Sequence, residues 1–178
     1  MITVKDSYFS KEFFDLVEEE SKDSEEHEGR VNIADPRPDE DMRRSTVKFF
    51  ESPKVRNELF ELINIINAED YRFDIYNHAH MQYTIYDESN KGHYNWHRDD
   101  GFLGGGYLRR KISVSIQLSS SWDYEGGDFE IEDYELPDWT RRKGTALVFP
   151  SFMNHRVTPV TKGTRKSLVA WFYGPNWR

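Results

Sequence analysis

The second part of the chain is a succession of short apolar segments separated by glycine-containing turns, and this pattern limits the possible fold more than any other feature. Residues 112–118 alternate apolar and polar side chains, as a strand with one buried face does. Further strand candidates are residues 71–86, 129–131, 145–149, 156–160 and 167–173. Many short strands in sequence predict an antiparallel sandwich or barrel.

Two helices are expected before these strands. The first covers residues 10–22, where Ser10 can cap the helix and the apolar positions recur at helical spacing. The second begins at Ser52, with Pro53 at the first helical position, and continues through Asn67. Helices followed by strands predict an α+β chain that is mainly β.

The bulk properties predict one packed domain. A length of 178 residues favours a single domain, 1–178, with a helical part over 1–70 and a strand-rich core over 71–178. The absence of cysteine excludes disulfides and Cys-based metal sites. A net charge of −8 argues against nucleic-acid binding. Without a long apolar run we expect no signal peptide and no membrane segment, and therefore a cytoplasmic location.

The motif His97-Arg98-Asp99 suggests a metal site. Residues two apart in a strand share a face, so His97 and Asp99 can reach one ion. His155 is the best candidate for a third ligand, because it follows a predicted strand and a Pro-Ser turn. Two histidines and one carboxylate form the facial triad of non-haem Fe(II) oxygenases. The same three ligands would also suit a zinc hydrolase, which remains an alternative.

Arg165 is the residue that favours the oxygenase interpretation. It lies ten residues after His155, at or next to the following predicted strand. A guanidinium matches a carboxylate with two parallel hydrogen bonds, so Arg165 is expected to bind the far carboxylate of a 2-oxo dicarboxylate. His78 and His80 are a rival pair on one strand face. They lack a matching carboxylate pattern, and we interpret them as a structural pair or as part of the mouth of a site.

In order and spacing, these segments resemble the prolyl 4-hydroxylase-like branch of the 2-oxoglutarate/Fe(II)-dependent dioxygenase superfamily, especially its small microbial PKHD-type hydroxylases. The resemblance covers residues 86–174. It is carried by Tyr94-Asn95-Trp96-His97-Arg98-Asp99, by residues 124–131 and by residues 144–165. It implies a double-stranded β-helix, or cupin-like jelly-roll, core with N-terminal helices packed against it.

The resemblance also implies roles for individual residues. Arg165 would bind 2-oxoglutarate, and Tyr86 would contact cosubstrate or substrate. Relatives often carry a tyrosine where Gln117 falls here, so Gln117 or Tyr83 is expected to supply the hydrogen bond of that tyrosine. The implied Fe(II) ligands are His97, Asp99 and His155. The expected walls of the substrate pocket are Tyr94, Trp96 and Trp171.

The activity implied by the resemblance is hydroxylation of an aliphatic carbon, with O₂ as a second cosubstrate, succinate and CO₂ as co-products, and ascorbate as a reductant. The branch points to a prolyl residue in a peptide or protein. A free amino acid, another small molecule, or a non-catalytic jelly-roll binding module remain alternatives. Residues 18–44 and 101–110 are expected to border the substrate cleft, with a lid-like loop at residues 104–106.

Overall fold

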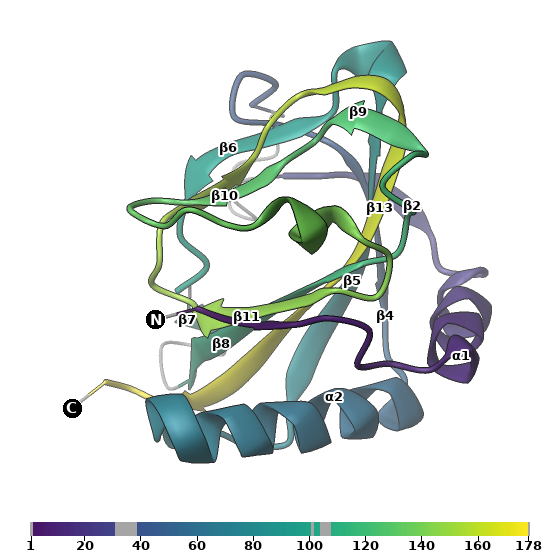
Figure 1. Cartoon of the computed structure of the whole chain (residues 1–178). Coiled ribbons are helices and arrows are strands. Elements are labelled where there is room, and N and C mark those ends of the chain that lie inside the picture. Colours follow the sequence, from purple (N-terminus) through teal and green to yellow (C-terminus); the bar gives the residue numbers. More distant parts are fainter. Residues whose placement is uncertain (1, 31–38, 101, 104–107, 178) are drawn as a thin grey trace.

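Two β-sheets lie face to face, and two helices cover the outer side of the larger one (Figure 1). The computed structural model describes residues 2–30, 39–100, 102–103 and 108–177. The helices are α1 (Lys11–Ser21) and α2 (Pro53–Ile66). Short helical turns follow at η1 (Asn67–Tyr71), η2 (Glu88–Asn90) and η3 (Asp138–Arg141). Among the described residues, no helix has the length and apolar character needed to cross a membrane.

The larger sheet has the strand order β1-β11-β8-β13-β5-β4-β2, with β7 paired to β8 and β9 paired to β13. The smaller sheet has the order β10-β12-β6-β3. The strands of the larger sheet are β1 (Thr3–Lys5), β2 (Glu26–Glu28), β4 (Thr46–Phe50), β5 (Ala79–Asp87), β7 (Phe102–Leu103), β8 (Leu108–Gln117), β9 (Tyr124–Gly126), β11 (Ala146–Pro150) and β13 (Val160–Pro175). Those of the smaller sheet are β3 (Arg43–Arg44), β6 (His93–His97), β10 (Phe129–Ile131) and β12 (His155–Val157).

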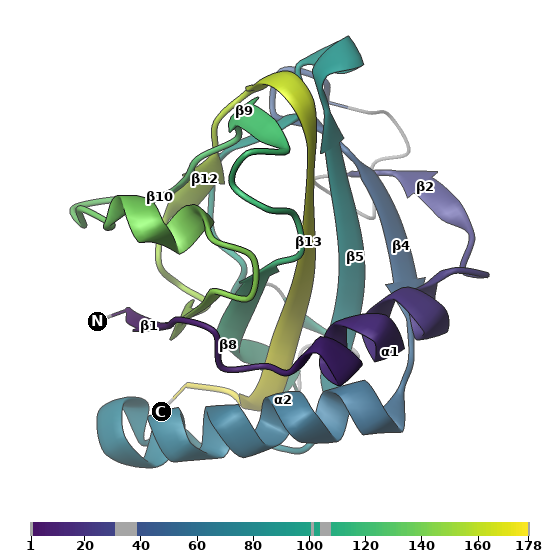
Figure 2. The ribbon, with the colours of Figure 1, turned by 45° about the vertical axis from the view of Figure 1, so that its right-hand side comes forward.

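Both predicted helices are confirmed, including their caps. The Ser10 hydroxyl accepts a hydrogen bond from the Phe13 N–H at 3.4 Å, and the Ser52 hydroxyl accepts one from the Val55 N–H at 3.3 Å. Such caps satisfy backbone donors that have no partner within the helix. Figure 2 shows both helices running beneath the larger sheet. The helices therefore bury their apolar faces against that sheet, as the jelly-roll expectation required.

The central strands β5, β8 and β13 carry different side chains on their two faces. Alternate residues point outward into the core with the helices, among them Met81, Tyr83, Ile112, Val114, Ile116, Leu168, Ala170 and Phe172. Burying one such aliphatic side chain contributes about 1.5–3 kcal/mol. The residues between them face the smaller sheet and are mostly polar: Gln82, Thr84, Ser113, Ser115, Gln117, Arg165 and Ser167. A buried polar row between two sheets marks the position of the site.

The N-terminal part contains more than the helices that were predicted for residues 1–70. Strands β1, β2, β3 and β4 lie in it as well. They were missed because each is five residues or shorter and is held by distant pairing, as when Thr46 of β4 pairs with Ile85. The strand predicted from residue 71 begins only at Ala79. Before it, Arg72 has a left-handed backbone (φ 55°), and the Asn67 side chain holds the backbone of Phe73. The proposed lid at 104–106 lies outside the described residues.

Candidate metal centre

Strand pairing in the smaller sheet brings the two predicted histidine ligands together. His97 ends β6, His155 begins β12, and the two residues are direct partners across these strands. Asp99 follows β6, and its N–H donates to the Ser151 carbonyl at 2.8 Å. The ligand atoms of His97, Asp99 and His155 lie within 4.8 Å of one another. No other group of this kind is found among the described residues.

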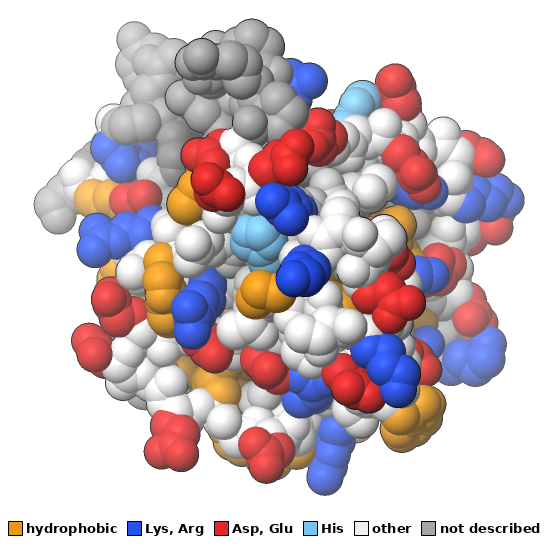
Figure 3. All heavy atoms as spheres, turned by 90° about the horizontal axis from the view of Figure 1, so that it is seen from above, with side chains coloured by type: hydrophobic (Ala, Val, Ile, Leu, Met, Phe, Trp, Pro, Cys, Tyr) orange, Lys and Arg blue, Asp and Glu red, His pale blue; other side chains and the backbone are white. Residues whose placement is uncertain are grey.

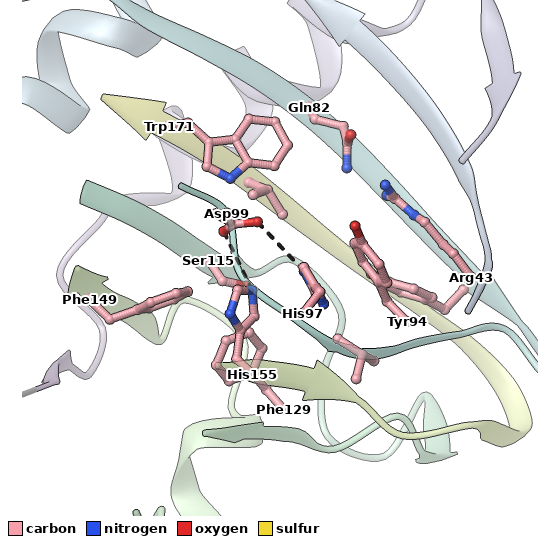
Figure 4. A pocket seen from close by; sticks show the side chains of 13 residues that line it. Arg43, Gln82, Tyr94, His97, Asp99, Ser115, Phe129, Phe149, His155 and Trp171 are labelled. Atoms are coloured by element: carbon pink, nitrogen blue, oxygen red, sulfur yellow. Dashed lines mark ion pairs between the residues drawn. The ribbon is translucent and has the colours of Figure 1, made fainter. Parts of the chain in front are cut away.

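Backbone contacts leave one nitrogen of each imidazole facing Asp99. His97 Nδ1 lies 2.7 Å from the Asn95 carbonyl oxygen, and His155 Nδ1 lies 3.0 Å from that of Met153. A carbonyl only accepts, so Nδ1 carries the proton and Nε2 keeps a lone pair. The two Nε2 atoms lie 3.6 and 3.4 Å from the oxygens of Asp99, as the dashed lines in Figure 4 mark. All three side chains therefore offer a donor atom to the same point.

The protonation states also suit metal binding. Burial alone would raise the pKa of Asp99, but the imidazoles of His155 and His97, when protonated, outweigh burial by their charge and by the hydrogen bond of His97, and they hold this pKa below its usual range. Burial lowers the pKa of His155, and the charge of Asp99 only partly offsets this. The Ser113 hydroxyl donates to Asp99 Oδ2 at 2.8 Å and fixes the carboxylate. A carboxylate and a neutral imidazole are the forms that coordinate metals.

A pocket opens beside the triad, and half of its other lining residues are aromatic. The Tyr94 ring stacks on the His97 ring at 3.4 Å between centres, with 11° between planes. Phe149 and Phe129 lie 4.8 and 5.4 Å from the His155 ring. The lining residues are Arg43, Gln82, Tyr86, Tyr94, His97, Asp99, Ser115, Phe129, Phe149, His155, Val157, Val169 and Trp171. Such walls fix the histidine rings and restrict water around the triad.

Arg165 has unpaired donors deep inside the fold. It lies on β13 opposite Tyr86, whose ring centre is 5.4 Å from Arg165 Cζ, and has no exposed surface. Its one side-chain hydrogen bond is long, from Nη1 to the Ser167 hydroxyl at 3.4 Å. Its Nε and Nη2 have no partner among the described residues, and neither has the Tyr124 hydroxyl nor Gln117 Oε1. A buried cation with free donors is unfavourable unless an anion completes it. A carboxylate, such as that of 2-oxoglutarate, would supply the anion and match the planar guanidinium.

Some of the other residues considered from the sequence line the pocket, and others lie outside it. Tyr86, Tyr94 and Trp171 line the pocket, and their roles toward cosubstrate or substrate stay predictions. Gln117 is buried on the same sheet face as Arg165, where its partner across the strands is Ser167. His80 bonds the Tyr173 hydroxyl at 3.2 Å and contributes nothing to the triad.

Two predicted site residues were placed wrongly. Tyr83 lies on the outer sheet face, where its hydroxyl donates to Glu18 Oε1 at 2.7 Å, so it cannot bind 2-oxoglutarate. Trp96 is 37% exposed and packs against Arg156, whose Cζ is 4.7 Å from the ring centre. Both errors follow from strand geometry, because neighbouring residues point to opposite faces. Trp96 therefore points away from the pocket that His97 faces.

Several residues that line the pocket or lie near Arg165 were not predicted from the sequence. Gln82 could have been found, because it shares a strand face with Tyr86. Tyr124 lies directly before the glycine turn at residues 125–127, which gives no direct signal for its hydroxyl. Arg43 lies in a two-residue strand and had no recognisable pattern around it.

A jelly-roll core with a site of two histidines and one carboxylate is typical of non-haem Fe(II) oxygenases. The family model of the 2OG-Fe(II) oxygenase superfamily matches residues 81–173, more than half of the chain. The chain therefore belongs to the 2OG-Fe(II) oxygenase superfamily. The resemblance inferred from the motifs is confirmed.

The curated relatives are similar over the catalytic segment. A PKHD-type hydroxylase of Idiomarina loihiensis is 38% identical over 91 residues, which are 48% of this chain and 41% of the relative. A PKHD-type hydroxylase of Gloeothece citriformis is 41% identical over 79 residues, which are 44% of this chain and 36% of the relative. The matched region thus spans about two-fifths of the length of these relatives.

Solved structures share the fold over nearly the whole chain. A prolyl-4-hydroxylase of Pseudomonas putida superposes with a TM-score of 0.74 at 18% identity, covering 98% of this chain and 93% of that one. A prolyl hydroxylase of Trichoplax adhaerens, in complex with a peptide fragment of a hypoxia-inducible factor, gives a TM-score of 0.72 at 15% identity, covering 97% and 83%. The predicted jelly-roll class is confirmed by this likeness.

Proposed function

We propose that the chain is an Fe(II)- and 2-oxoglutarate-dependent dioxygenase that hydroxylates an aliphatic carbon, with a prolyl residue of a peptide or protein as the first candidate substrate. The observation that carries the proposal is a buried triad with three converging donor atoms, together with the fully buried Arg165 and its unpaired nitrogens. The names of the relatives, PKHD-type and prolyl hydroxylases, support the substrate.

The residues of the triad would hold Fe(II) through His97 Nε2, His155 Nε2 and the Asp99 carboxylate. Arg165 would hold the far carboxylate of 2-oxoglutarate. When bound, the metal and 2-oxoglutarate together supply O₂ activation and C–H oxidation, with succinate and CO₂ as co-products. Ascorbate would act as a reductant, and residues 1–178 would act as one catalytic domain.

The protein's own contribution is orientation and shielding. The Asn95 and Met153 carbonyls fix the tautomer of the two histidines, and Ser113 holds Asp99. The Tyr124 hydroxyl is a buried donor without a partner that would complete the shell around the cosubstrate carboxylate. Gln117 would contribute only through its amide N–H groups, because its unpaired Oε1 is an acceptor. The aromatic walls would keep bulk water from the reacting carbon.

The test is succinate formation that depends on both Fe(II) and 2-oxoglutarate, with a peptide and amino-acid panel read by mass spectrometry for the gain of one oxygen. His97→Ala should abolish turnover and the saturable metal site. His80→Ala is the matched control, because His80 lies outside the triad, and it should retain both. Hydrolysis without succinate would support a zinc hydrolase instead. The absence of a saturable metal site would support a binding module.

A further inference from the structure

Arg43 is a buried arginine that lines the pocket, and it pairs with no carboxylate of the described residues. Only 6% of its surface is exposed. Its Nε donates to the Ser45 hydroxyl at 2.8 Å, and its Nη1 to the Arg30 carbonyl at 3.4 Å. These partners are neutral, so they leave the charge of the guanidinium unbalanced. Arginine is rarely buried in this way without an anion.

The position of Arg43 places its charge close to the metal centre. Figure 4 shows its side chain reaching toward Gln82 and Tyr94 on one side of the pocket. Arg43 Cζ lies 4.4 Å from the centre of the Tyr94 ring, and that centre lies 3.4 Å from the centre of the His97 ring. The guanidinium carbon is therefore at most 7.8 Å from the His97 ring centre, the sum of these two distances. An anion on Arg43 would lie only a few bonds from a carbon held at the metal.

Arg43 also differs from the other lining residues in its place in the sequence. Every other described lining residue falls within residues 81–173, the segment matched by the family. The triad and Arg165 lie in that segment and already account for the metal and the cosubstrate. Arg43 comes from β3, outside that segment. Because the substrate is what differs between proteins of one fold, Arg43 is a candidate for substrate binding.

We propose that Arg43 binds a carboxylate of the substrate, so that this site acts on an acid whose carboxylate lies a few bonds from the hydroxylated carbon. The inference rests on the proposed function and adds the substrate class to it. The wall formed by Phe149, Val169 and Trp171 would hold the apolar part of the same molecule. An α-carboxylate and an acidic side chain offer the same group to Arg43.

Recognition of the acid is local. The chain carries a net charge of −8, which would repel an anion at long range. Figure 3 shows acidic and basic side chains intermixed on one face, with Lys or Arg side chains flanking a histidine near its middle. A broad basic surface is therefore not what would draw an acid to the pocket. The guanidinium of Arg43, which faces no carboxylate of the described residues, supplies the selectivity at short range.

The first experiment uses the protein loaded with Zn(II), in place of redox-active Fe(II), and with 2-oxoglutarate. Uptake of both is checked first, so a failure of the proposed function is seen separately. Acetate is then titrated while the Nε–H NMR signal of Arg43, assigned by its loss in Arg43→Gln, is followed. We expect a saturable shift. A response no larger than that to chloride at equal ionic strength would overturn the proposal.

The second experiment compares matched acids and amides by calorimetry on the same loaded protein. L-proline is paired with L-prolinamide, and an amidated Gly-Pro-Asp peptide with its Asn counterpart, so the two pairs distinguish the two carboxylate sources. At least one acid should bind about tenfold or more tightly than its amide, as expected for a charge-assisted hydrogen bond. Equal affinity in both pairs, including no binding of any member, contradicts the proposal.

The variants assign that preference to one side chain. Arg43→Gln should remove it, and Arg43→Lys, which keeps the charge but not the planar fork, should retain part of it. Arg44→Gln is the matched control, because the next residue turns outward to Glu40 at 3.5 Å and should keep the full preference. Loss of the preference in Arg44→Gln, or its survival in a folded Arg43→Gln protein, would assign the acid to another site.

Discussion

The two faces of the larger sheet differ in how completely their buried polar groups are paired. On the outer face, the hydroxyl of Tyr83 has a partner in Glu18, and the surrounding side chains pack against the helices. On the inner face, Arg165 and Tyr124 keep donors that pair with nothing among the described residues. Unpaired buried donors lower stability. The outer face therefore stabilises the fold. The inner face is less stable without a ligand, because its donors are left free to bind one.

The largest effect on this difference between the two faces is expected for Arg165→Gln. Loss of the charged partner should weaken 2-oxoglutarate binding by about 2–5 kcal/mol, roughly 30-fold to several thousand-fold. The free energy of unfolding without ligand should stay the same or rise, because a buried unpaired cation is removed. Calorimetric titration of Zn(II)-loaded protein and urea unfolding measure the two quantities.

Lys166→Gln is the matched control for Arg165→Gln. Lys166 is the next residue of β13 and is half-buried on the opposite sheet face. Its replacement should leave 2-oxoglutarate binding unchanged. A large loss of stability in Arg165→Gln with undiminished affinity would show that the arginine is structural.

The opposite result is expected on the outer face, for Leu59→Ala in α2. Leu59 has no exposed surface and packs in the core beneath the sheet. Its truncation should lower the free energy of unfolding by about 2–5 kcal/mol. Affinity for 2-oxoglutarate should not change at temperatures where the variant is folded. Glu58→Ala on the exposed side of the same helix should shift stability by about 0.5 kcal/mol or less.

The same two faces explain how much could be predicted from the sequence. Alternation within β5 separates Met81, Tyr83 and Ile85 from the residues between them. It does not say which set faces the site, because helices cover the outer side and both faces are buried. Tyr83 was misplaced for this reason. The pair His97 and Asp99 could be predicted because it is encoded locally, and His155 could be predicted because it follows a predicted strand and turn.

The N-terminal strands mark the limit of local reasoning. Strand β3 is two residues long and exists because Arg43 and Arg44 pair with Tyr94 and His93, some fifty positions later. No pattern within so short a segment predicts a strand. A pocket residue on it, Arg43, was therefore invisible before the structure. Both β3 and β4 became recognisable only through their long-range partners.

The smallest expected effects come from two variants that each remove a single hydroxyl, Tyr83→Phe and Tyr124→Phe. The first breaks the bond to Glu18 and should lower the free energy of unfolding by about 0.5–1.5 kcal/mol, with unchanged affinity for 2-oxoglutarate. The second removes a buried hydroxyl that has no partner, so stability should hold or rise. If that hydroxyl is kept for the cosubstrate carboxylate, affinity should fall about tenfold, which is about 1.4 kcal/mol. Urea unfolding and calorimetry on both variants measure these two effects. If both variants lose only stability, Tyr124 is a structural residue, and the contrast between the two sheet faces does not extend to β9.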